Sequence, residues 1–293
     1  MKKFLFFGNY FYGICVVGLS IEASLQQQIK LPPIIYVLFV FCAAVVYYTK
    51  AYIAETIDTK ANERSFWYVK NRNYIFNSQV LLTVLLAVFG LLLLPNILSG
   101  IKNLTIKDAA LLLSFPLVGL LYYGLSAKLS LRNTHWLKPF VIGFVWAGIV
   151  TLFPLFYSQL STQSPFNIGL VSCFLFIKNL MFVAVLCIMF DIKDYATDYN
   201  QHLKTFVVSF GLRKTIFYIL IPLTLIGFAS FVMIAFSRHF SAIKIAINTI
   251  PFIILLVVAY SLHKRKNIFY YLAVIDGLML LKAVCGSVAM IYF

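Results

Sequence analysis

The sequence predicts an all-α integral membrane protein with nine transmembrane helices, and three observations lead to that fold class. Of the 293 residues, 62% are hydrophobic and only 11% are charged, whereas soluble domains have roughly a quarter of their residues charged. The apolar residues form long runs, and about 20 such residues in a helix cross a bilayer. The basic residues gather beside alternate runs. Together these features exclude a soluble globular domain, a disordered chain and a secreted disulfide scaffold.

Nine apolar stretches are long enough to cross a bilayer as helices, which satisfy their backbone hydrogen bonds internally. The first follows Lys2 and Lys3, and its length and internal polar residues favour a retained span over a signal peptide ending near Ala23. The second is the shortest. In chain order the expected spans cover residues 4–21, 34–49, 79–95, 108–125, 140–157, 168–189, 215–236, 241–262 and 268–291.

The distribution of Lys and Arg predicts the orientation of the chain. If the spans alternate in direction, 17 of the 24 basic residues lie on the side of the N-terminus, five lie on the opposite side and two lie inside spans. Basic residues are retained in the cytoplasm during insertion, so we expect a cytoplasmic N-terminus and an external C-terminus. Residues 1–293 then form a single multi-pass domain, expected in a bacterial inner membrane, with cytoplasmic polar loops 50–78, 126–138 and 190–214.

Charge and cysteine content exclude two other classes of protein. The net charge of +15 is explained by orientation in the membrane and not by nucleic acid, because the basic residues form no basic domain. The five cysteines lie within apolar runs and have neither CxxC spacing nor neighbouring histidines. Neither a disulfide framework nor a zinc site is therefore indicated.

Three charged residues lie inside the expected spans, where ionisable groups usually have a function or a partner. We expect Asp276 to pair with Lys178 across two helices, the alternative being that Asp276 lines a substrate cavity. Lys282 is close to the C-terminus. We expect its long side chain to extend towards the membrane surface.

The acidic residues are concentrated in two cytoplasmic loops, which hold six of the nine. Asp191, Asp194 and Asp198 follow the sixth span at i, i+3 and i+7, which places the three carboxylates on one face if the helix continues. Mg²⁺ favours one or two carboxylates completed by water and phosphate oxygens. The pattern predicts a magnesium site that binds a diphosphate, and a solvated acidic loop is the alternative.

The segment Asp191–Asp198, followed by Lys204, Thr205 and Gly211, resembles the second aspartate-rich motif of the UbiA superfamily of intramembrane prenyltransferases. In that family the motif reads approximately DxxDxxxD, is followed by a Lys-Thr pair and a glycine, and lies between helices six and seven. The resemblance implies a nine-helix UbiA-like bundle. It also implies catalytic and metal-binding roles for the three aspartates of the motif and a diphosphate-binding role for Lys204.

The first motif of the family, NxxxDxxxD between helices two and three, is degenerate in this sequence. The best register places Lys50, Ala54 and Asp58 at the three positions, so that only Asp58 keeps its expected type. The resemblance implies a catalytic and metal-binding role for Asp58. Glu55, Asp58 and Asn62 repeat the 3,4 spacing of the second motif and form a shifted set of candidate metal ligands.

Several other residues resemble the diphosphate-binding segments of the family. Arg64 ends a segment that looks like the Asn-Arg-Pro element with its proline replaced. Tyr123 precedes a loop that looks like the tyrosine-lysine segment, and Lys128, Arg132 and Lys138 lie within it. A basic loop beside an acidic one suits a metal-diphosphate complex. For Arg132 and Lys138 the alternative is that they serve only to orient the chain.

The resemblance implies Mg²⁺-dependent transfer of an isoprenyl group from a prenyl diphosphate to a lipophilic, aromatic acceptor within the membrane. Such an enzyme transfers alkyl or aryl groups other than methyl, and neutralising the diphosphate lets the allylic C–O bond ionise. Trp146 and Tyr122 are candidates to stabilise the carbocation. The alternatives are a repurposed or inactive member, such as a terpene cyclase or lipid-binding protein, and a secondary transporter, which usually has its ionisable site near the bilayer midplane.

Overall fold

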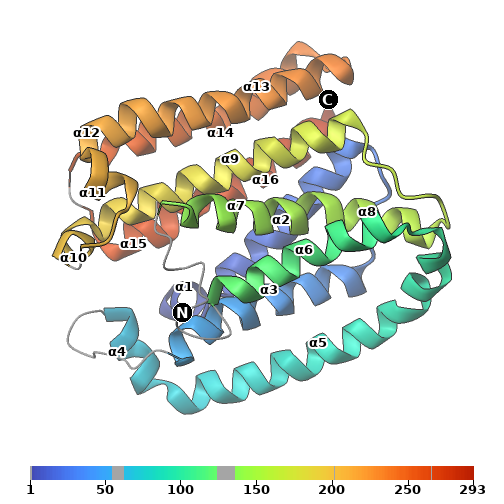
Figure 1. The fold of residues 1–293 in the computed structure, drawn as a ribbon, viewed down its shortest axis with the longest axis horizontal. Coiled ribbons are helices and arrows are strands. Elements are labelled where there is room, and N and C mark those ends of the chain that lie inside the picture. Colours follow the sequence, from blue (N-terminus) through green and yellow to red (C-terminus); the bar gives the residue numbers. More distant parts are fainter. Residues whose placement is uncertain (1, 55–62, 124–135, 201, 265) are drawn as a thin grey trace.

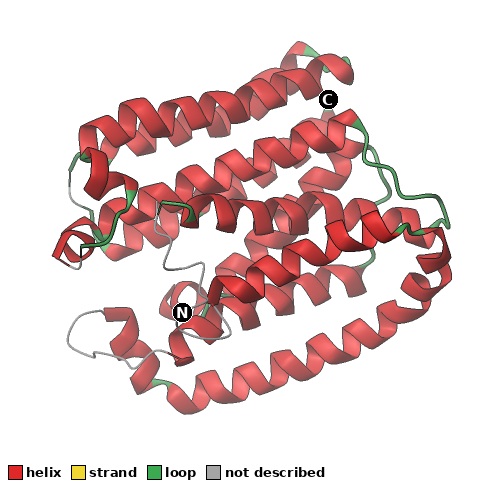
Figure 2. Cartoon of the chain, in the orientation of Figure 1, coloured by secondary structure: helices red, strands yellow, loops and turns green. Residues whose placement is uncertain are grey.

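The computed structural model describes residues 2–54, 63–123, 136–200, 202–264 and 266–293. Helices account for most of these residues, and no β-strand occurs among them (Figure 2). The long helices lie side by side and run along one general direction (Figure 1). The expected all-α class is therefore confirmed.

The helices up to residue 123 are arranged as long segments joined by short ones. In chain order they are α1 (Lys2–Phe7), α2 (Tyr10–Gln27), α3 (Ile34–Ala54), α4 (Glu63–Lys70), α5 (Arg72–Gly100), the short 3₁₀ helix η1 (Ile101–Asn103) and α6 (Ile106–Tyr123).

The remaining helices include three π-helical turns within longer helical segments. They are α7 (Lys138–Ala147), the π turn η3 (Gly148–Leu152), α8 (Phe153–Ser161), α9 (Leu170–Lys193), α10 (Tyr195–Asn200), α11 (Phe206–Phe210), α12 (Leu212–Thr215), the π turn η4 (Ile216–Leu220), α13 (Ile221–Ser237), α14 (Ala242–Ser261), α15 (Ile268–Tyr270), the π turn η5 (Tyr271–Ile275) and α16 (Gly277–Tyr292).

Long apolar helices make the chain a multi-pass membrane protein. Among the described residues, six segments are long and apolar enough to span a membrane, and a shorter apolar helix covers Ile34–Lys50. The six segments are Arg72–Asn103, Lys138–Ser161, Leu170–Lys193, Leu212–Ser237, Ala242–Ser261 and Ile268–Tyr292. Each of the nine expected stretches overlaps helical residues of the structure, but the first is divided between α1 and α2, and neither α2 nor α6 is among these six segments.

Helix α9 lies at the centre of the bundle. It packs against α7 on one side and α13 on the other, an arrangement visible in Figure 1. Helix α5 is at the periphery, where it packs mainly on α3. Only 11% of the most apolar 18-residue stretch of this segment is buried. Most of the surface of α5 is therefore available to lipid, whereas α9 can hold functional groups inside the bundle.

The first expected span begins later than its hydrophobicity predicts. The apolar run from residue 4 is divided into α1 and α2 at Asn9, whose backbone is left-handed with φ 65°. Asparagine tolerates this conformation better than most residues. The Asn9 side chain is also buried and donates to Thr49 Oγ1 and Tyr68 Oη, both at 3.1 Å. These contacts fix the break, and the helix that follows it runs from Tyr10 to Gln27.

The buried charges pair differently from the expectation. Lys178 donates not to Asp276 but to Glu22 Oε1 at 2.8 Å, and Lys282 donates to Glu22 Oε2 at 2.5 Å. Lys282 is 3% exposed, so its side chain points into the bundle and not to the membrane surface. Hydrophobicity alone did not show that Glu22 lies within a helix of the bundle, because α2 extends nearly two turns beyond the predicted end at residue 21. Both expectations were wrong for that reason.

Candidate active site

An apolar cavity of about 690 Å³ lies inside the bundle. Residues from α2, α3, α5, α6, α7, η3 and α8 line it, so it is enclosed by helices far apart in the sequence. Its volume is within the usual range for a small-molecule site, about 300–1,000 Å³. The lining residues are Tyr12, Val16, Phe39, Val40, Ala43, Ala44, Tyr47, Tyr48, Tyr52, Leu86, Pro116, Gly119, Leu120, Tyr122, Lys138, Val141, Ile142, Val145, Trp146, Ile149 and Phe153.

One end of this cavity, which we call the polar end, is formed by Tyr52, Tyr122 and Lys138. These residues lie near the C-termini of α3 and α6 and at the N-terminus of α7, which meet at the same end of the bundle (Figure 1). Lys138 is the charged group among the cavity-lining residues. The polar end therefore offers an ammonium group to a ligand whose apolar part fills the bundle.

The acidic motif meets the cavity through Asp191. Its carboxylate lies in the last turn of α9 and accepts a hydrogen bond from Lys138 Nζ at 2.9 Å. The Asp191 side chain is 2% exposed and that of Lys138 is 32% exposed. A buried ion pair of this kind fixes the position of the ammonium group, because breaking it leaves an uncompensated buried charge.

The helix that carries the aspartates ends earlier than predicted. α9 ends at Lys193, Asp194 is its C-cap residue, and α10 begins at Tyr195. Among the described residues, no group of three or more Asp, Glu, His or Cys side chains is close enough to hold a metal. The expected single helical face of three carboxylates is thus replaced by two helices that meet at Asp194.

Asp194 and Asp198 remain one helical turn apart. The Asp198 amide donates to the Asp194 carbonyl at 2.9 Å, and residues at i and i+4 are neighbours on a helix. The Asp194 side chain is 52% exposed and lies 3.2 Å from Lys193 Nζ. Both aspartates lie at the end of the bundle that contains the polar end of the cavity (Figure 1).

Arg64, which the sequence assigns to diphosphate binding, holds protein groups together. It is 4% exposed and its guanidinium donates to Tyr52 Oη at 2.8 Å and to the Phe7 carbonyl at 3.1 Å, and also to Asn9 Oδ1. The guanidinium also lies 4.0 Å from the centre of the Tyr52 ring. Because Tyr52 lines the cavity, Arg64 supports the polar end from behind.

Tyr68 completes the attachment of α4 to the N-terminal helix. Its hydroxyl donates to the Phe7 carbonyl at 2.8 Å. Burial raises the pKa of Tyr68 to about 12, so the hydroxyl stays protonated at neutral pH. The short helix α4 is thus fixed beside the cavity by neutral and cationic donors.

The other residues assigned from the sequence are placed less fully. Lys204 is exposed in the segment before α11. Tyr123 is the last residue of α6, and its side chain is not among those described. Five assigned residues lie outside the described part of the chain: Glu55, Asp58, Asn62, Lys128 and Arg132.

Aromatic residues form one wall of the cavity. The Tyr12 and Tyr48 rings are stacked with centroids 4.6 Å apart, and Trp146 donates its indole N–H to Tyr48 Oη. The Trp146 and Tyr122 side chains, which were candidates to stabilise a cation, both line the cavity. Ring faces attract cations, so this wall suits a ligand that develops positive charge.

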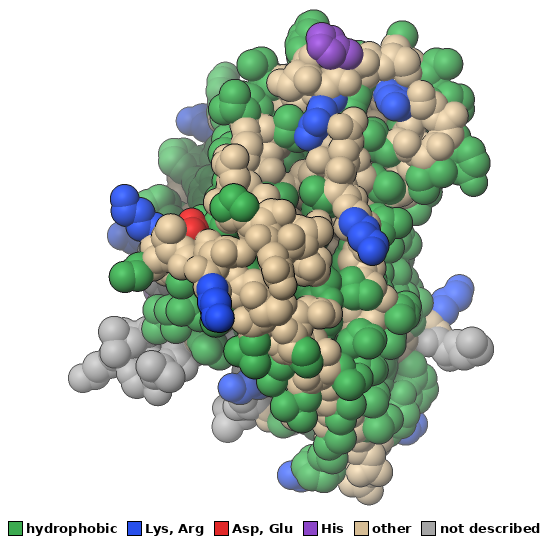
Figure 3. Space-filling model, turned by 90° about the vertical axis from the view of Figure 1, so that its right-hand side faces the viewer, with side chains coloured by type: hydrophobic (Ala, Val, Ile, Leu, Met, Phe, Trp, Pro, Cys, Tyr) green, Lys and Arg blue, Asp and Glu red, His purple; other side chains and the backbone are tan. Residues whose placement is uncertain are grey.

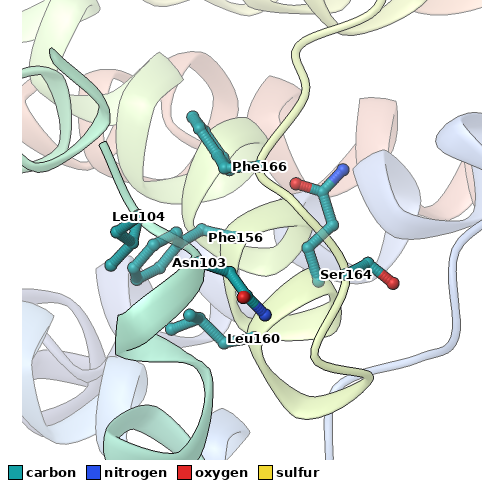
Figure 4. Close-up of a pocket in the computed structure, with 7 residues that line it drawn as sticks. Asn103, Leu104, Phe156, Leu160, Ser164 and Phe166 are labelled. Carbon is teal, nitrogen blue, oxygen red and sulfur yellow. The ribbon is translucent and has the colours of Figure 1, made fainter.

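A second hollow lies at the opposite end of the bundle. Figure 4 shows a crevice there between Asn103, Leu104, Phe156 and Phe166, whose volume of about 0 Å³ leaves no room for a ligand. In the end-on view of Figure 3, the Lys and Arg side chains are dispersed over that face. The large cavity is therefore the candidate site.

The fold and the cavity define a class: multi-pass α-helical membrane proteins that enclose an aromatic, apolar chamber with an acid-base pair at one end. No protein-family model and no curated protein sequence matches the chain. The structure is similar to that of a digeranylgeranylglyceryl phosphate synthase, a membrane prenyltransferase of the UbiA superfamily, with a TM-score of 0.58 and 14% identity over 100% of both chains. The predicted UbiA resemblance is thus confirmed for the fold.

Two residues of the candidate site were not assigned from the sequence. Lys138 was weighed both as part of the loop that resembles the tyrosine-lysine segment and as a residue that orients the chain, without a choice between the two. Tyr12 was noted only as an interruption in an apolar run. The sequence signal for Lys138 is its position at the very start of a span, because a basic residue there lies at one end of the bundle. No sequence signal identifies Tyr12, because its role depends on helices that lie far apart in the chain.

Proposed function

We propose that this protein transfers an isoprenyl group from a prenyl diphosphate to a lipophilic acceptor within the membrane. The observation that carries the proposal is the apolar cavity of about 690 Å³, whose polar end holds Lys138 against Asp191 beside the aspartate-rich segment. An isoprenoid chain fits the apolar part, and a diphosphate fits the cationic end. The fold similarity to a membrane prenyltransferase supports the same assignment.

Different residues in and around the cavity have different roles in the proposed reaction. Lys138 neutralises charge that develops on the leaving diphosphate, and Asp191 holds the ammonium in place. Lys204 and the proposed diphosphate ligands Tyr123, Lys128 and Arg132 act from the connecting segments. The aromatic wall faces the allylic carbocation, and the apolar lining favours its capture by the acceptor over capture by water.

The aspartate-rich segment supplies candidate ligands for a single Mg²⁺ ion. Asp194 and Asp198 are neighbours on one helical turn, and Mg²⁺ in phosphate-binding sites is usually held by one or two carboxylates with substrate oxygens. We propose that these two residues hold the ion, with Asp191 behind them and with Glu55, Asp58 and Asn62 as further candidates. A bound ion supplies charge neutralisation at the diphosphate.

The proposal includes the arrangement in the membrane. We propose a single domain of nine spans with the N-terminus and the aspartate-rich segment in the cytoplasm, since water-soluble diphosphates are made available there. Figure 1 supports an odd number of crossings, because the N- and C-termini lie at opposite ends of the bundle. An aromatic acceptor is one possibility, and a glycerol-based lipid of the kind named for the similar synthase is another.

The test uses the purified full-length protein in lipid nanodiscs with Mg²⁺. Geranyl, farnesyl and geranylgeranyl diphosphates serve as donors, and a long-chain alkyl phenol and geranylgeranylglyceryl phosphate serve as acceptors. Diphosphate release and joined product are measured together, the product by mass spectrometry. We expect a joined product with at least one pair. The proposal is overturned if no donor releases diphosphate, or if release yields only a hydrocarbon or alcohol, which indicates a cyclase or hydrolase.

Site variants link the activity to the cavity. A hydrogen bond to a charged group contributes about 1.5–3 kcal/mol, so we expect Lys138→Gln to lower kcat/KM by about 10- to 100-fold. Asp194→Ala should abolish turnover at Mg²⁺ levels that saturate the unchanged protein. Lys102→Gln changes an exposed residue at the opposite end of the bundle and should leave turnover unchanged.

A further inference from the structure

A buried carboxylate lies directly behind the aromatic wall of the cavity. Asp276 is 4% exposed and accepts a hydrogen bond at 2.8 Å from the hydroxyl of Tyr12, which lines the cavity. The two residues come from helices at opposite ends of the chain. The tyrosine therefore joins the ligand space on one side to a buried proton acceptor on the other.

The backbone places Asp276 in this position through an unusual turn. Its amide donates to the Tyr271 carbonyl at 3.1 Å, which closes the π turn η5, and α16 begins at the next residue. Single π turns inside helices are frequent at functional sites. Asp276 is eight residues beyond Ile268, where the last span begins, which corresponds to a depth of about 12 Å along a helix. The carboxylate thus lies below the polar end, where the reacting carbon of a prenyl chain would lie.

Burial of the carboxylate is not explained by an ion pair in the described residues. Lys178 and Lys282, the two lysines that lie inside the expected spans, both form ion pairs with Glu22. A carboxyl group in a membrane span is costly and usually has a function. The Tyr12 hydroxyl suggests such a function for Asp276, because it lines the cavity and can pass a proton to the carboxylate.

Resting on the proposed function, we propose that Tyr12 and Asp276 remove the proton that the acceptor loses when it is prenylated. The C–O bond of the prenyl diphosphate breaks, and the diphosphate leaves with the electron pair. The acceptor oxygen bonds to the allylic carbon, its proton passes to Tyr12 Oη, and the Tyr12 proton passes to the Asp276 carboxylate. Tyr12 contacts the acceptor, and Asp276 acts through it. The acceptor class is accordingly a lipid or phenol with a free hydroxyl group.

The proposal separates two steps that can be measured apart. Ionisation of the donor requires the polar end, whereas proton removal requires the Tyr12–Asp276 pair. If the pair is impaired, the carbocation is still formed and is captured by water, which releases a prenyl alcohol. Diphosphate release should therefore continue while the joined product falls.

The experiment compares Tyr12→Phe and Asp276→Asn with the unchanged protein, using geranylgeranyl diphosphate and the hydroxyl acceptor that gives most product. We expect joined product to fall by at least about 10-fold in both variants while diphosphate release changes by less than about twofold, because general base catalysis contributes a factor of about 10²–10⁴. Asp276→Glu should recover part of the product. Tyr12→Phe keeps the ring and so separates the hydroxyl from ring stacking.

Controls keep folding apart from chemistry. Tyr36→Phe removes a hydroxyl from a buried tyrosine that packs on Tyr157 and does not line the cavity, and it should leave both readouts unchanged. Thermal unfolding in detergent identifies a variant that does not fold, in which case the other variant decides. The proposal is overturned if release and product fall in parallel, or if neither falls. Absence of diphosphate release from the unchanged protein overturns the proposed function itself, and this inference with it.

Discussion

At the scale of single residues, the most consequential group inside the bundle is the carboxylate of Glu22. It is fully buried and accepts hydrogen bonds from both Lys178 and Lys282. Lys178 also donates a hydrogen bond to Gln26 Oε1, and Lys282 donates one to Asn179 Oδ1, each at 2.7 Å. Because these contacts join α2, α9 and α16, one acidic side chain ties together helices from three parts of the chain.

Glu22→Gln should destabilise the protein strongly. The substitution keeps the size of the side chain but leaves two buried lysines without a counter-charge, and breaking a buried ion pair costs about 3–5 kcal/mol. The measurement is the thermal unfolding midpoint in detergent micelles.

The matched control is Glu63→Gln, which breaks an exposed pair with Lys3 at 2.8 Å. An exposed pair contributes about 0–1 kcal/mol, so this variant should unfold close to the unchanged protein. Equal shifts for the two substitutions would contradict the assignment of Glu22 to the core.

At the scale of helices, the sequence predicts where helices occur far better than how they pair. Every expected span overlaps helical residues, because long apolar runs have few alternatives in a bilayer. The break at Asn9 and the end of α9 at Lys193 were not predicted, since each depends on contacts or on packing beyond the run. The pairing of Lys178 with Glu22 was missed for the same reason.

The sequence predicted those parts of the candidate site that are adjacent in the chain, and it did not predict the contacts between distant residues. The aspartate-rich segment could be recognised because its residues are adjacent in the chain, and Asp191 does reach the cavity through Lys138. The Tyr12–Asp276 contact joins residues that are 264 positions apart. No spacing rule identifies such a pair, because it arises only when the first and last helices are packed together.

The contact between α7 and α9 determines the geometry of the Lys138–Asp191 pair, since each helix carries one partner. Gly143 lies in this contact, and a Cβ atom there would lie 2.7 Å from the Leu180 carbonyl oxygen. Small residues allow such close approach of membrane helices. Gly143→Ala should therefore separate the helices and cost about 1–3 kcal/mol through overpacking.

We expect Gly143→Ala to lower both the unfolding temperature and the rate of diphosphate release. Gly277→Ala is the matched control, because a Cβ atom there meets nothing within 4 Å. Unchanged stability and unchanged release in Gly143→Ala would show that the spacing of α7 and α9 does not set the site. A loss of stability without any effect on diphosphate release would show that the α7–α9 contact stabilises the protein but does not determine the geometry of the Lys138–Asp191 pair.

At the scale of the whole molecule, the arrangement of charge and the position of the cavity agree. The polar end lies at the same end of the bundle as α10, α11 and the N-terminal helix (Figure 1). The connections at that end contain most of the basic residues, and basic residues are retained in the cytoplasm during insertion. We therefore expect the same charge bias to place the polar end on the cytoplasmic side, where anionic diphosphates occur.

This orientation predicts which residues a membrane-impermeant thiol reagent can reach. In a background without the five native cysteines, Tyr199→Cys should be labelled only in inside-out vesicles, because it lies on exposed α10 beside the aspartates. Thr162→Cys, exposed at the other end of α9, and Tyr292→Cys, near the C-terminus, should be labelled only from outside. Labelling is quantified by the mass increase of the intact protein, and lysed membranes show whether each thiol reacts at all.

The three positions also test the number of crossings. α9 alone separates Thr162 from Tyr199, so opposite labelling of these two requires that α9 spans the bilayer. Tyr199 and Tyr292 are separated by the segments that begin at Leu212, Ala242 and Ile268, and an odd number of crossings puts them on opposite sides. Labelling of Tyr199 from outside would invert the molecule, place the polar end away from cytoplasmic diphosphates and contradict the charge argument.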